Sequence, residues 1–312
     1  MMMPLFITGA NGFVGRRVVR ALAAAQIPDI RLLLREPDDM AATYRDAPGW
    51  QFIRGRLETP TQWNDSLRGA GAILHLASST GKASPRVHRD IIVRGTEQLL
   101  ASARVAGVPR FLFVSSVAAG FPNRRYYAYA EAKRRAEAAV DASALDTLIV
   151  RPTMVLGPGS ALGAALRRLA LLPAPVVFGS GTTLVQPIHV DDLADLLIAS
   201  LASPRAWDGQ TLTVGGRDVV NIEELLRRFR MTVTADHPRW LHVPIEPLRT
   251  VLGLLEPLLR AVMPLTAGQL ATFANDGVAD ERGAQWTTLL SDRALPLRGL
   301  DAMLTPAVTH VS

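Results

Sequence analysis

The chain has 312 residues, of which 48% are apolar and 20% are charged, a composition typical of globular proteins and unlike that of disordered or collagen-like chains. It contains no cysteine, which excludes disulfides, thiolate metal sites and cysteine nucleophiles. The net charge is +6, but the arginines are dispersed, so we expect no nucleic-acid partner. Lys82 and Lys133 are the only lysines, and this scarcity makes their positions informative.

The N-terminal residues show no targeting pattern, because no charged segment precedes an apolar one before the first predicted strand. The longest apolar neighbourhood, from Pro247 to Pro264, is interrupted by Arg249, Glu256 and Arg260. It therefore falls short of the ~20 apolar residues that a membrane-spanning helix needs. We expect a cytoplasmic protein without a transmembrane segment.

Short apolar runs alternate with longer helical patterns through the first half of the chain. Strands are predicted over Leu5–Thr8, Ile30–Leu34, Gln51–Arg54, Ala72–Leu76, Phe111–Ser115 and Thr147–Val150. Helices are predicted around Phe13–Ala25, Thr61–Leu67, Val87–Ala106 and Tyr129–Val140. This alternation predicts an α/β fold, a doubly wound parallel sheet with helices on both faces and ligands at the carboxyl ends of its strands.

The pattern changes after about residue 156, where proline and glycine become more frequent. A predicted helix over Ile188–Leu201 and a predicted strand over Thr211–Val214 can return to the first sheet. The residues after about Val220 are leucine-rich and mostly helical in pattern. We therefore expect a sheet domain over residues 1–156, rejoined by the chain around 184–215, and a smaller, mostly helical C-terminal part over residues 157–312.

A glycine-rich loop follows the first predicted strand and opens the first predicted helix. Its candidate cofactor-binding residues are Gly9, Asn11, Gly12, Phe13, Val14 and Gly15. Glycine permits a tight turn and a close approach to a pyrophosphate, and the following helix start presents free N–H groups. The spacing alone is weak evidence, but its place in a β–α–β unit predicts a dinucleotide site.

The choice between NAD(H) and NADP(H) depends on the end of the second strand, where an acidic residue would bind the ribose hydroxyl. Here Arg35 follows that strand, and Arg16 follows the glycine loop. Two guanidinium groups favour a 2′-phosphate, although the adjacent Glu36 argues the other way. We expect NADP(H) rather than NAD(H).

Tyr129 and Lys133 form a Tyr-x-x-x-Lys pair on one predicted helix. A phenol normally titrates near ~10, and a nearby ammonium lowers that pKa toward the working range of an acid/base group. Lysine can also bind a ribose hydroxyl. An amphipathic surface helix is the structural alternative for this segment.

Ser115 and Ser116 end the fifth predicted strand at the same edge of the sheet as the glycine loop. A hydroxyl there can donate to a substrate carbonyl oxygen as negative charge develops on it. Serines at strand ends also start ordinary turns. The position relative to Tyr129 favours Ser116 as the functional serine.

These motifs together resemble the extended and atypical short-chain dehydrogenases/reductases of the NAD-dependent epimerase/dehydratase superfamily. Further matching segments are His75–Ser78, Gly95–Thr96, Arg151–Thr153, Gly157–Gly159 and Gln186–Asp192. The resemblance implies that Tyr129 is the acid/base, that Lys133 is its partner and ribose anchor, and that Ser116 donates to the carbonyl. It also implies that the sheet domain over residues 1–156 is a Rossmann NAD(P)-binding domain and that the C-terminal part over residues 157–312 binds the substrate. Further implications are cofactor contact at Ala77, a small-molecule substrate and a homodimer.

Some residues depart from the family pattern. Arg56 stands where an aspartate is common, and Ile92 replaces a frequent asparagine. The short interval between Ser116 and Tyr129 is closer to the atypical branch that includes the NADPH-binding accessory subunit of respiratory complex I. The expected activity is hydride transfer between nicotinamide and a carbonyl or alcohol carbon. The alternatives are a non-catalytic NADP(H)-binding subunit or redox sensor and a nucleotide-sugar epimerase/dehydratase.

Other features are assigned structural roles. We expect Asp191 or Asp192 to cap the helix that follows His189, with no metal site there. His75 is expected to order the glycine loop, and Lys82 to be a solvated loop residue. The helical leucine pattern of Leu248–Met263 predicts packing of the C-terminal part, with a lipid-like ligand or peripheral membrane contact as the alternative.

Overall fold

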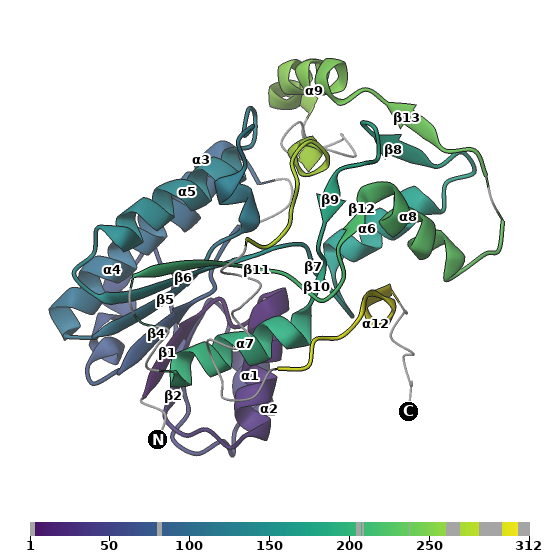
Figure 1. The fold of residues 1–312 in the computed structure, drawn as a ribbon. Helices are drawn as coiled ribbons and strands as arrows, with labels where there is room; N and C mark the ends of the chain where they lie inside the picture. The colour runs from purple at the N-terminus through teal and green to yellow at the C-terminus, as the bar shows by residue number, and fades with distance from the viewer. Residues whose placement is uncertain are drawn as a thin grey trace.

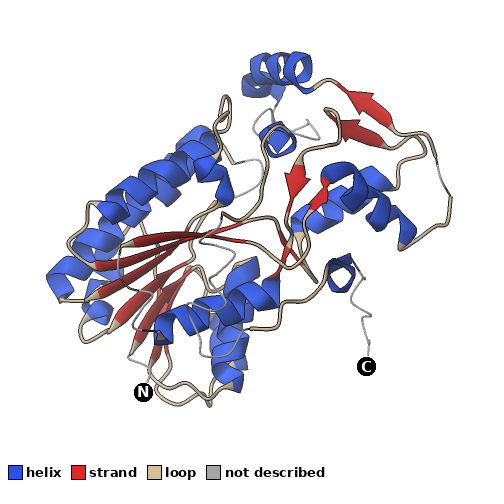
Figure 2. Cartoon of the chain, viewed as in Figure 1, coloured by secondary structure: helices blue, strands red, loops and turns tan. Residues whose placement is uncertain are grey.

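A seven-stranded parallel sheet forms the centre of the computed structural model, which describes residues 4–79, 83–203, 207, 209–236, 238–259, 269–280 and 295–304. The strand order is β3-β2-β1-β4-β5-β6-β11. Figures 1 and 2 show this sheet between two layers of helices. The strands are β1 (Leu5–Thr8), β2 (Ile30–Leu34), β3 (Gln51–Arg54), β4 (Ala72–His75), β5 (Arg110–Val114), β6 (Asp146–Pro152) and β11 (Gln210–Val214). The predicted doubly wound fold is confirmed.

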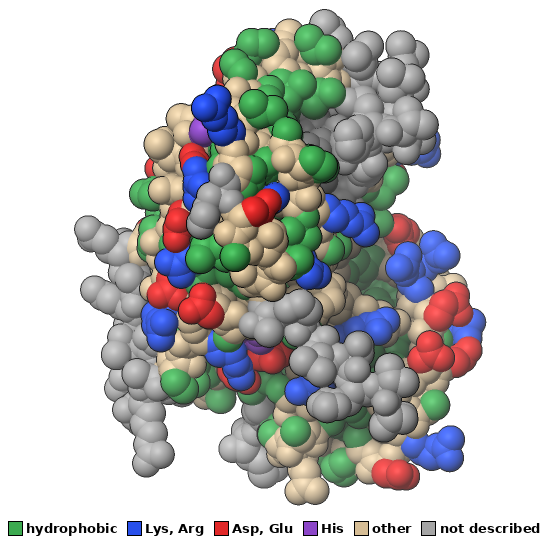
Figure 3. All heavy atoms as spheres, turned by 90° about the vertical axis from the view of Figure 1, so that its right-hand side faces the viewer, with side chains coloured by type: hydrophobic (Ala, Val, Ile, Leu, Met, Phe, Trp, Pro, Cys, Tyr) green, Lys and Arg blue, Asp and Glu red, His purple; other side chains and the backbone are tan. Residues whose placement is uncertain are grey.

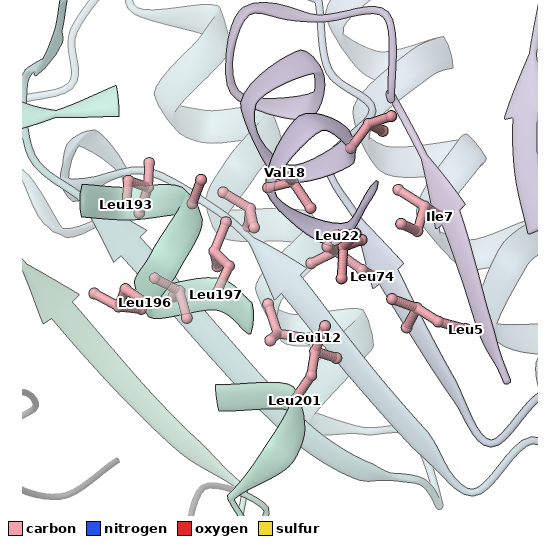
Figure 4. Packing of buried hydrophobic residues seen from close by; sticks show 14 of the residues in the cluster. Leu5, Ile7, Val18, Leu22, Leu74, Leu112, Leu193, Leu196, Leu197 and Leu201 are labelled. Atoms are coloured by element: carbon pink, nitrogen blue, oxygen red, sulfur yellow. The ribbon is translucent and has the colours of Figure 1, made fainter. Parts of the chain in front are cut away.

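Helices cover both faces of the sheet because successive strand residues point to opposite sides. Leu5 and Ile7 of β1 enter a core under α1 (Phe13–Ala24) and α7 (Val190–Ala202), part of which Figure 4 shows. Phe6 enters the opposite core, under α4 (Gly95–Ala106) and α5 (Ala128–Asp141). The two cores fix the sheet, and with it the edge where the strands end.

The chain rejoins this domain through a late segment. α7 packs against α1, and β11 pairs in parallel with β6 at the end of the sheet. The apolar residues of α7, including Leu193 and Leu197, lie in the same core as those of β1. α7 and β11 are therefore part of the sheet domain, although elements of the smaller C-terminal part precede them in the chain.

The predicted helix over Thr61–Leu67 is wrong. Two short 3₁₀ turns stand there instead, Pro60–Gln62 and Asn64–Leu67. They are separated at Trp63, whose backbone leaves the helical region and whose indole N–H donates to the carbonyl of Arg56 at 2.8 Å. A short helix, α2 (Asp38–Thr43), was not predicted, since six residues carry too little periodicity.

The predicted helix over Val87–Ala106 is interrupted. α3 (Pro85–His88) passes into a π-helical turn, Arg89–Arg94, before α4 begins. The Thr96 hydroxyl donates to the carbonyl oxygen of Ile92 at 2.5 Å. A π turn inserts an extra residue into a helix and commonly occurs beside functional sites.

A smaller part with its own core lies beyond the carboxyl edge of the sheet, to the right in Figure 1. Its helices are α6 (Ala161–Ala170), α8 (Ile222–Met231), α9 (Ile245–Leu259), the 3₁₀ turn η6 (Gln269–Phe273) and α12 (Leu300–Leu304). Its strands are β7 (Val155–Leu156), β8 (Val176–Phe178), β9 (Leu184–Val185), β10 (Ile188–His189), β12 (Val220–Asn221) and β13 (Leu241–Val243), joined as three two-stranded sheets. The C-terminal part therefore mixes helices with short strands.

The cap of α7 differs from the prediction. His189 is the N-cap, and its Nδ1 accepts the backbone N–H of Asp191 at 3.1 Å. Asp192 instead is buried and accepts both the backbone N–H of Arg298, at 2.8 Å, and its guanidinium group. Asp191 and Asp192 lie in the first turn of α7, where their charges favour the helix without capping it.

The leucine pattern of Leu248–Met263 lies partly in α9. Leu248 and Leu252 pack against the C-terminal core, as the core-packing interpretation predicts, and the charged Arg249 between them is also buried, at 1% exposed. The end of the pattern, residues 260–263, lies outside the described residues. In the part of the chain that the structure describes, no helix has the length and apolarity to cross a membrane. Basic, acidic and hydrophobic side chains are intermingled on the face shown in Figure 3.

Candidate functional site

The glycine loop joins β1 to α1 at the carboxyl edge of the sheet. Gly9 has φ +76°, and a Cβ there would lie 2.5 Å from the backbone nitrogen of Ala77. A Cβ on Gly15 would lie 2.2 Å from the carbonyl oxygen of Gly9. Both positions therefore require glycine, and the loop lies directly against Ala77 at the end of β4.

The same loop leaves the start of α1 open to an anion. Gly12 is the N-cap and provides no side-chain hydrogen bond, and no acidic residue occupies the first turn. The first N–H groups of any helix lack an intrahelical partner, and here they belong to Phe13 and its neighbours. Backbone donors at a positive helix end fit the pyrophosphate of a dinucleotide.

The residues proposed to choose the cofactor lie near this loop. Asn11 donates from Nδ2 to the carbonyl oxygen of Glu36 at 3.3 Å, which connects the glycine loop to the turn after β2. Arg16 and Arg35 are exposed, and Nε of Arg16 donates to the carbonyl oxygen of Asn11 at 3.0 Å. The Glu36 carboxylate is paired with Arg54 at 3.2 Å. Arg35 is thus exposed beside an acidic residue whose charge is partly neutralised.

His75 orders the base of the glycine loop, as the sequence predicts. Its Nδ1 lies 2.6 Å from the hydroxyl of Thr8, the residue before Gly9, and its Nε2 lies 3.0 Å from the hydroxyl of Thr96. Complete burial, reinforced by the charge of Lys133, lowers the pKa of His75 to about 3. The ring is therefore neutral at physiological pH and serves as a hydrogen-bonding bridge.

Tyr129 lies in the first turn of α5 with two hydroxyl groups beside its phenol. The hydroxyl groups of Ser116 and Ser78 lie close enough to the phenol to act on its pKa. Burial raises the pKa of Tyr129 above its ordinary value, and the two hydroxyls oppose that rise. The structure thus places Ser116 and Tyr129 together at the end of β5, where the sequence predicts them.

The two serines of the predicted pair have different surroundings. Ser115 is buried, and its hydroxyl has no hydrogen-bond partner among the described residues. The Ser116 hydroxyl accepts the backbone N–H of Ala118 at 3.2 Å. That bond occupies a lone pair of the oxygen and leaves its hydrogen free to donate. Ser116 is therefore the serine oriented for a second partner.

Lys133 does not act on Tyr129 in the way the sequence predicts. Its Nζ donates to the carbonyl oxygen of Val114 at 2.7 Å and lies 4.7 Å from the ring centre of Phe113. Burial lowers the pKa of Lys133 to about 7, against the opposing charge of Glu137. The prediction of a lowered Tyr129 pKa is wrong for the protein alone, because burial of the phenol dominates.

Buried Lys133 has a consequence for the pH dependence of stability. Its ordinary pKa of 10.5 falls to about 7 in the folded protein, so the unfolded chain binds more protons between these values. The free energy of unfolding should therefore gain up to ~1.4 kcal/mol per pH unit from this group as pH rises through that window. In Lys133→Met this contribution disappears. Urea unfolding at several pH values measures the slope, and equal slopes in the two proteins would contradict the assignment.

Ser78 and His88 are two neighbours of Tyr129 to which sequence reasoning gave no role. Ser78 belongs to the family-like segment His75–Ser78, and its position just after β4 indicates that it lies at the carboxyl edge of the sheet. The His88 ring packs edge-on against Tyr129 at 5.7 Å between ring centres, and its Nδ1 lies 2.8 Å from the hydroxyl of Ser79. No sequence pattern indicated that contact. Lys82 lies outside the described residues.

The described residues contain no cluster of three or more His, Asp or Glu side chains that could hold a metal ion. The polar groups at the carboxyl edge are instead hydroxyls, one buried ammonium and backbone N–H donors. Such a set can bind an anionic cofactor and exchange a proton with a bound oxygen atom.

Comparison with known proteins agrees with this geometry. A model of the NAD dependent epimerase/dehydratase family matches residues 5–215. The ceramide reductase of Caulobacter vibrioides is 36% identical over 202 residues, which are 64% of this chain and 61% of that protein. The matched region thus spans less than two thirds of that relative.

Two further comparisons extend over more of the chain. The mitochondrial NADH dehydrogenase [ubiquinone] 1 alpha subcomplex subunit 9 of Arabidopsis thaliana is 27% identical over 317 residues, covering 95% of this chain and 73% of that protein. The solved dTDP-glucose 4,6-dehydratase of Streptomyces venezuelae, with NAD and TYD bound, has a TM-score of 0.65 at 24% identity, covering 77% of this chain and 84% of that one. At that identity the likeness is one of fold.

Proposed function

Because the chain belongs to the NAD-dependent epimerase/dehydratase family, and is therefore an enzyme that uses a pyridine nucleotide, we propose that it is an oxidoreductase acting on a carbonyl/alcohol pair. The observation that carries the proposal is the contact of the Tyr129 phenol with Ser116. Both side chains lie at the carboxyl edge of the sheet that also holds the glycine loop. A nicotinamide cofactor held by the glycine loop at this edge would supply or accept the hydride.

The residues of the chain then handle the oxygen atom and its proton. The phenol of Tyr129 gives its proton to the carbonyl oxygen in the reductive direction and recovers one in the reverse direction. Its raised pKa keeps it protonated at neutral pH, which suits the role of an acid. The Ser116 hydroxyl donates a hydrogen bond to the same oxygen and stabilises the charge that develops there.

Lys133 supports the site through its hydrogen bond to the backbone at the end of β5. One of its three N–H donors is bound to the Val114 carbonyl, which ties α5 to the end of β5. The remaining donors are available to a ribose hydroxyl when the cofactor is bound. The ammonium would then bind the cofactor and at the same time hold the helix that carries Tyr129.

For the cofactor we propose NADP(H), held by the glycine-loop residues Gly9, Asn11, Gly12, Phe13, Val14 and Gly15, with Arg16 and Arg35 at the 2′-phosphate. Arg35→Ala should weaken NADPH binding by about 10- to 100-fold, as expected for losing one charge-assisted contact. NADH binding should change by less than threefold, which corresponds to ~0.6 kcal/mol. Calorimetric titration of both cofactors measures this. An equal loss for the two cofactors would argue against Arg35 as the phosphate contact.

The function is tested by assaying purified protein with NADPH and NADH against carbonyl compounds, including long-chain ketones and nucleotide sugars. Ketones are chosen because a named relative is a ceramide reductase, and sugars because a solved neighbour is a sugar-nucleotide dehydratase. Turnover of a ketone, abolished in Tyr129→Phe, supports the proposal. Tight cofactor binding without any turnover would favour a cofactor-binding subunit, the role suggested by the name of the Arabidopsis relative.

A further inference from the structure

The loop from Phe121 to Tyr127 connects the turn that begins at Ser116 to the helix that carries Tyr129. It is held from outside by the C-terminal part of the chain. Nη2 of Arg249, in α9, donates to the carbonyl oxygen of Arg125 at 2.6 Å and to Oδ1 of Asn123 at 3.3 Å. A residue more than a hundred positions away thus fixes the segment directly before the proposed acid/base.

Asn275 holds the same loop at a second point. Its side chain accepts the backbone N–H of Asn123 at 3.2 Å and donates to the carbonyl oxygen of the same residue at 3.1 Å. It also donates to the carbonyl oxygen of Ala271 at 2.8 Å. Nearby, Phe273 packs against Phe178 with 5.2 Å between ring centres, which anchors this segment in the C-terminal core.

The loop contains a strained residue between these holding points and Tyr129. Tyr126 has φ +62°, in the left-handed region that glycine prefers. The residue is 41% exposed, so burial of its ring does not offset the strain of this backbone conformation. A bulky residue in the left-handed region costs free energy and persists where its surroundings over-determine it. Tyr126 directly precedes Tyr127, the N-cap of α5, so its backbone sets the direction in which that helix begins.

The burial of Arg249 indicates that this side chain is present for its hydrogen bonds to the Phe121–Tyr127 loop. The side chain is 1% exposed, and its ion-pair partner, Glu246 at 3.2 Å, is 66% exposed. Its Nε has no hydrogen-bond partner among the described residues. Burying a guanidinium group without all of its hydrogen-bond partners costs more free energy than burying an apolar side chain of similar size. Packing of the core therefore does not by itself explain why an arginine occupies position 249.

We propose that Arg249 and Asn275 are positioning residues that hold the Phe121–Tyr127 loop in its strained conformation and thereby fix the Tyr129 phenol against Ser116. They would make the geometry of the acid/base depend on the C-terminal part, where the substrate is expected to bind. The catalytic consequence rests on the proposed function. The position and hydration of the phenol can be measured without any turnover.

The test compares Arg249→Met with wild type by ultraviolet titration of phenolate, subtracting the titration of Tyr129→Phe. We expect Tyr129 to titrate above its ordinary pKa in wild type and closer to it in the variant, because water reaches a phenol that is no longer held. Amide hydrogen exchange over residues 123–131 should become faster. With an active substrate, kcat should fall by roughly 10- to 100-fold while the Kd for cofactor stays unchanged.

Arg230→Met is the matched control. Arg230 is also buried in the C-terminal part and donates to the carbonyls of Ala170 and Leu172 at 2.7 and 3.0 Å, away from the loop. The Arg230→Met variant should have a lower Tm than wild type but the same pKa of Tyr129. If both variants move that titration equally, or neither does, the proposal is overturned.

Two further variants keep the test decisive. Should Arg249→Met not fold, Asn275→Ala replaces it, since it removes both bonds to Asn123 and leaves Arg249 in place. Tyr126→Gly removes the strain and should restore part of the lost kcat in either variant, and no restoration would count against the proposal. Equal turnover of wild type and Tyr129→Phe would instead overturn the proposed function, and the titration would still decide the role of Arg249 and Asn275.

Discussion

Tyr129→Phe should lower kcat by ~10²- to 10⁴-fold, the range expected for loss of a general acid. The substitution removes the hydroxyl that contacts Ser116 and Ser78 and keeps the ring that packs against His88. Cofactor affinity should be nearly unchanged, since the glycine loop is untouched. Steady-state kinetics in both directions, with calorimetric titration of NADPH, measure the two effects separately.

Tyr127→Phe is the matched control for this experiment. Tyr127 also lies at the start of α5, its ring centre is 5.8 Å from that of Tyr129, and burial likewise raises its pKa. It should retain kcat within a few-fold, because no contact places its phenol beside Ser116. A loss of equal size in the two variants would mean that both phenol hydroxyls are needed, and would contradict the assignment of the proton transfer to Tyr129 alone.

Gly15→Ala should destabilise the protein by about 3 kcal/mol or more and abolish cofactor binding. The added Cβ would lie 2.2 Å from the carbonyl oxygen of Gly9 and 2.7 Å from Cα of Ala10, contacts that rigid backbone cannot relieve without moving. The shift would open the turn whose N–H donors are proposed to bind the pyrophosphate. Urea unfolding and cofactor titration measure both losses.

Gly163→Ala, in α6, provides the control for this prediction. A Cβ there would meet Ser160 at 3.4 Å and Leu156 at 3.6 Å, which are ordinary contact distances. Because alanine is the better helix former, the variant should gain ~0.5–1 kcal/mol and bind cofactor normally. Equal stability of Gly15→Ala and Gly163→Ala would contradict the close packing of Gly15 against the carbonyl oxygen of Gly9.

The sheet was predictable because each strand is a short apolar run bounded by turn residues, and because alternation with helices leaves few topologies. The helix predicted over Thr61–Leu67 is wrong for a physical reason that the sequence does not show. Its helical pattern is interrupted at Trp63, whose indole binds the Arg56 carbonyl. Similarly, His189 rather than an aspartate caps α7, since the imidazole reaches the N–H of Asp191.

The candidate site was predictable where local spacing determines it. Tyr129 and Lys133 are one helical turn apart, and Ser116 lies two residues after the end of β5, at the same edge of the sheet. Burial, however, is a property of the whole fold. It raises the pKa of Tyr129, lowers that of Lys133 to about 7, and directs the ammonium to the Val114 carbonyl, none of which follows from spacing. The contacts of Arg249 with the loop are likewise visible only in three dimensions.

In the proposed reaction, hydride moves between the cofactor and the substrate carbon while Tyr129 moves the proton. The most direct test incubates the protein with NADPH carrying deuterium at the transferred position, together with the carbonyl panel, and follows the products by mass spectrometry. We expect one deuterium on the new alcohol carbon with wild type and almost none with Tyr129→Phe. Tight NADPH binding without deuterium in any product, or equal labelling by both proteins, would contradict it.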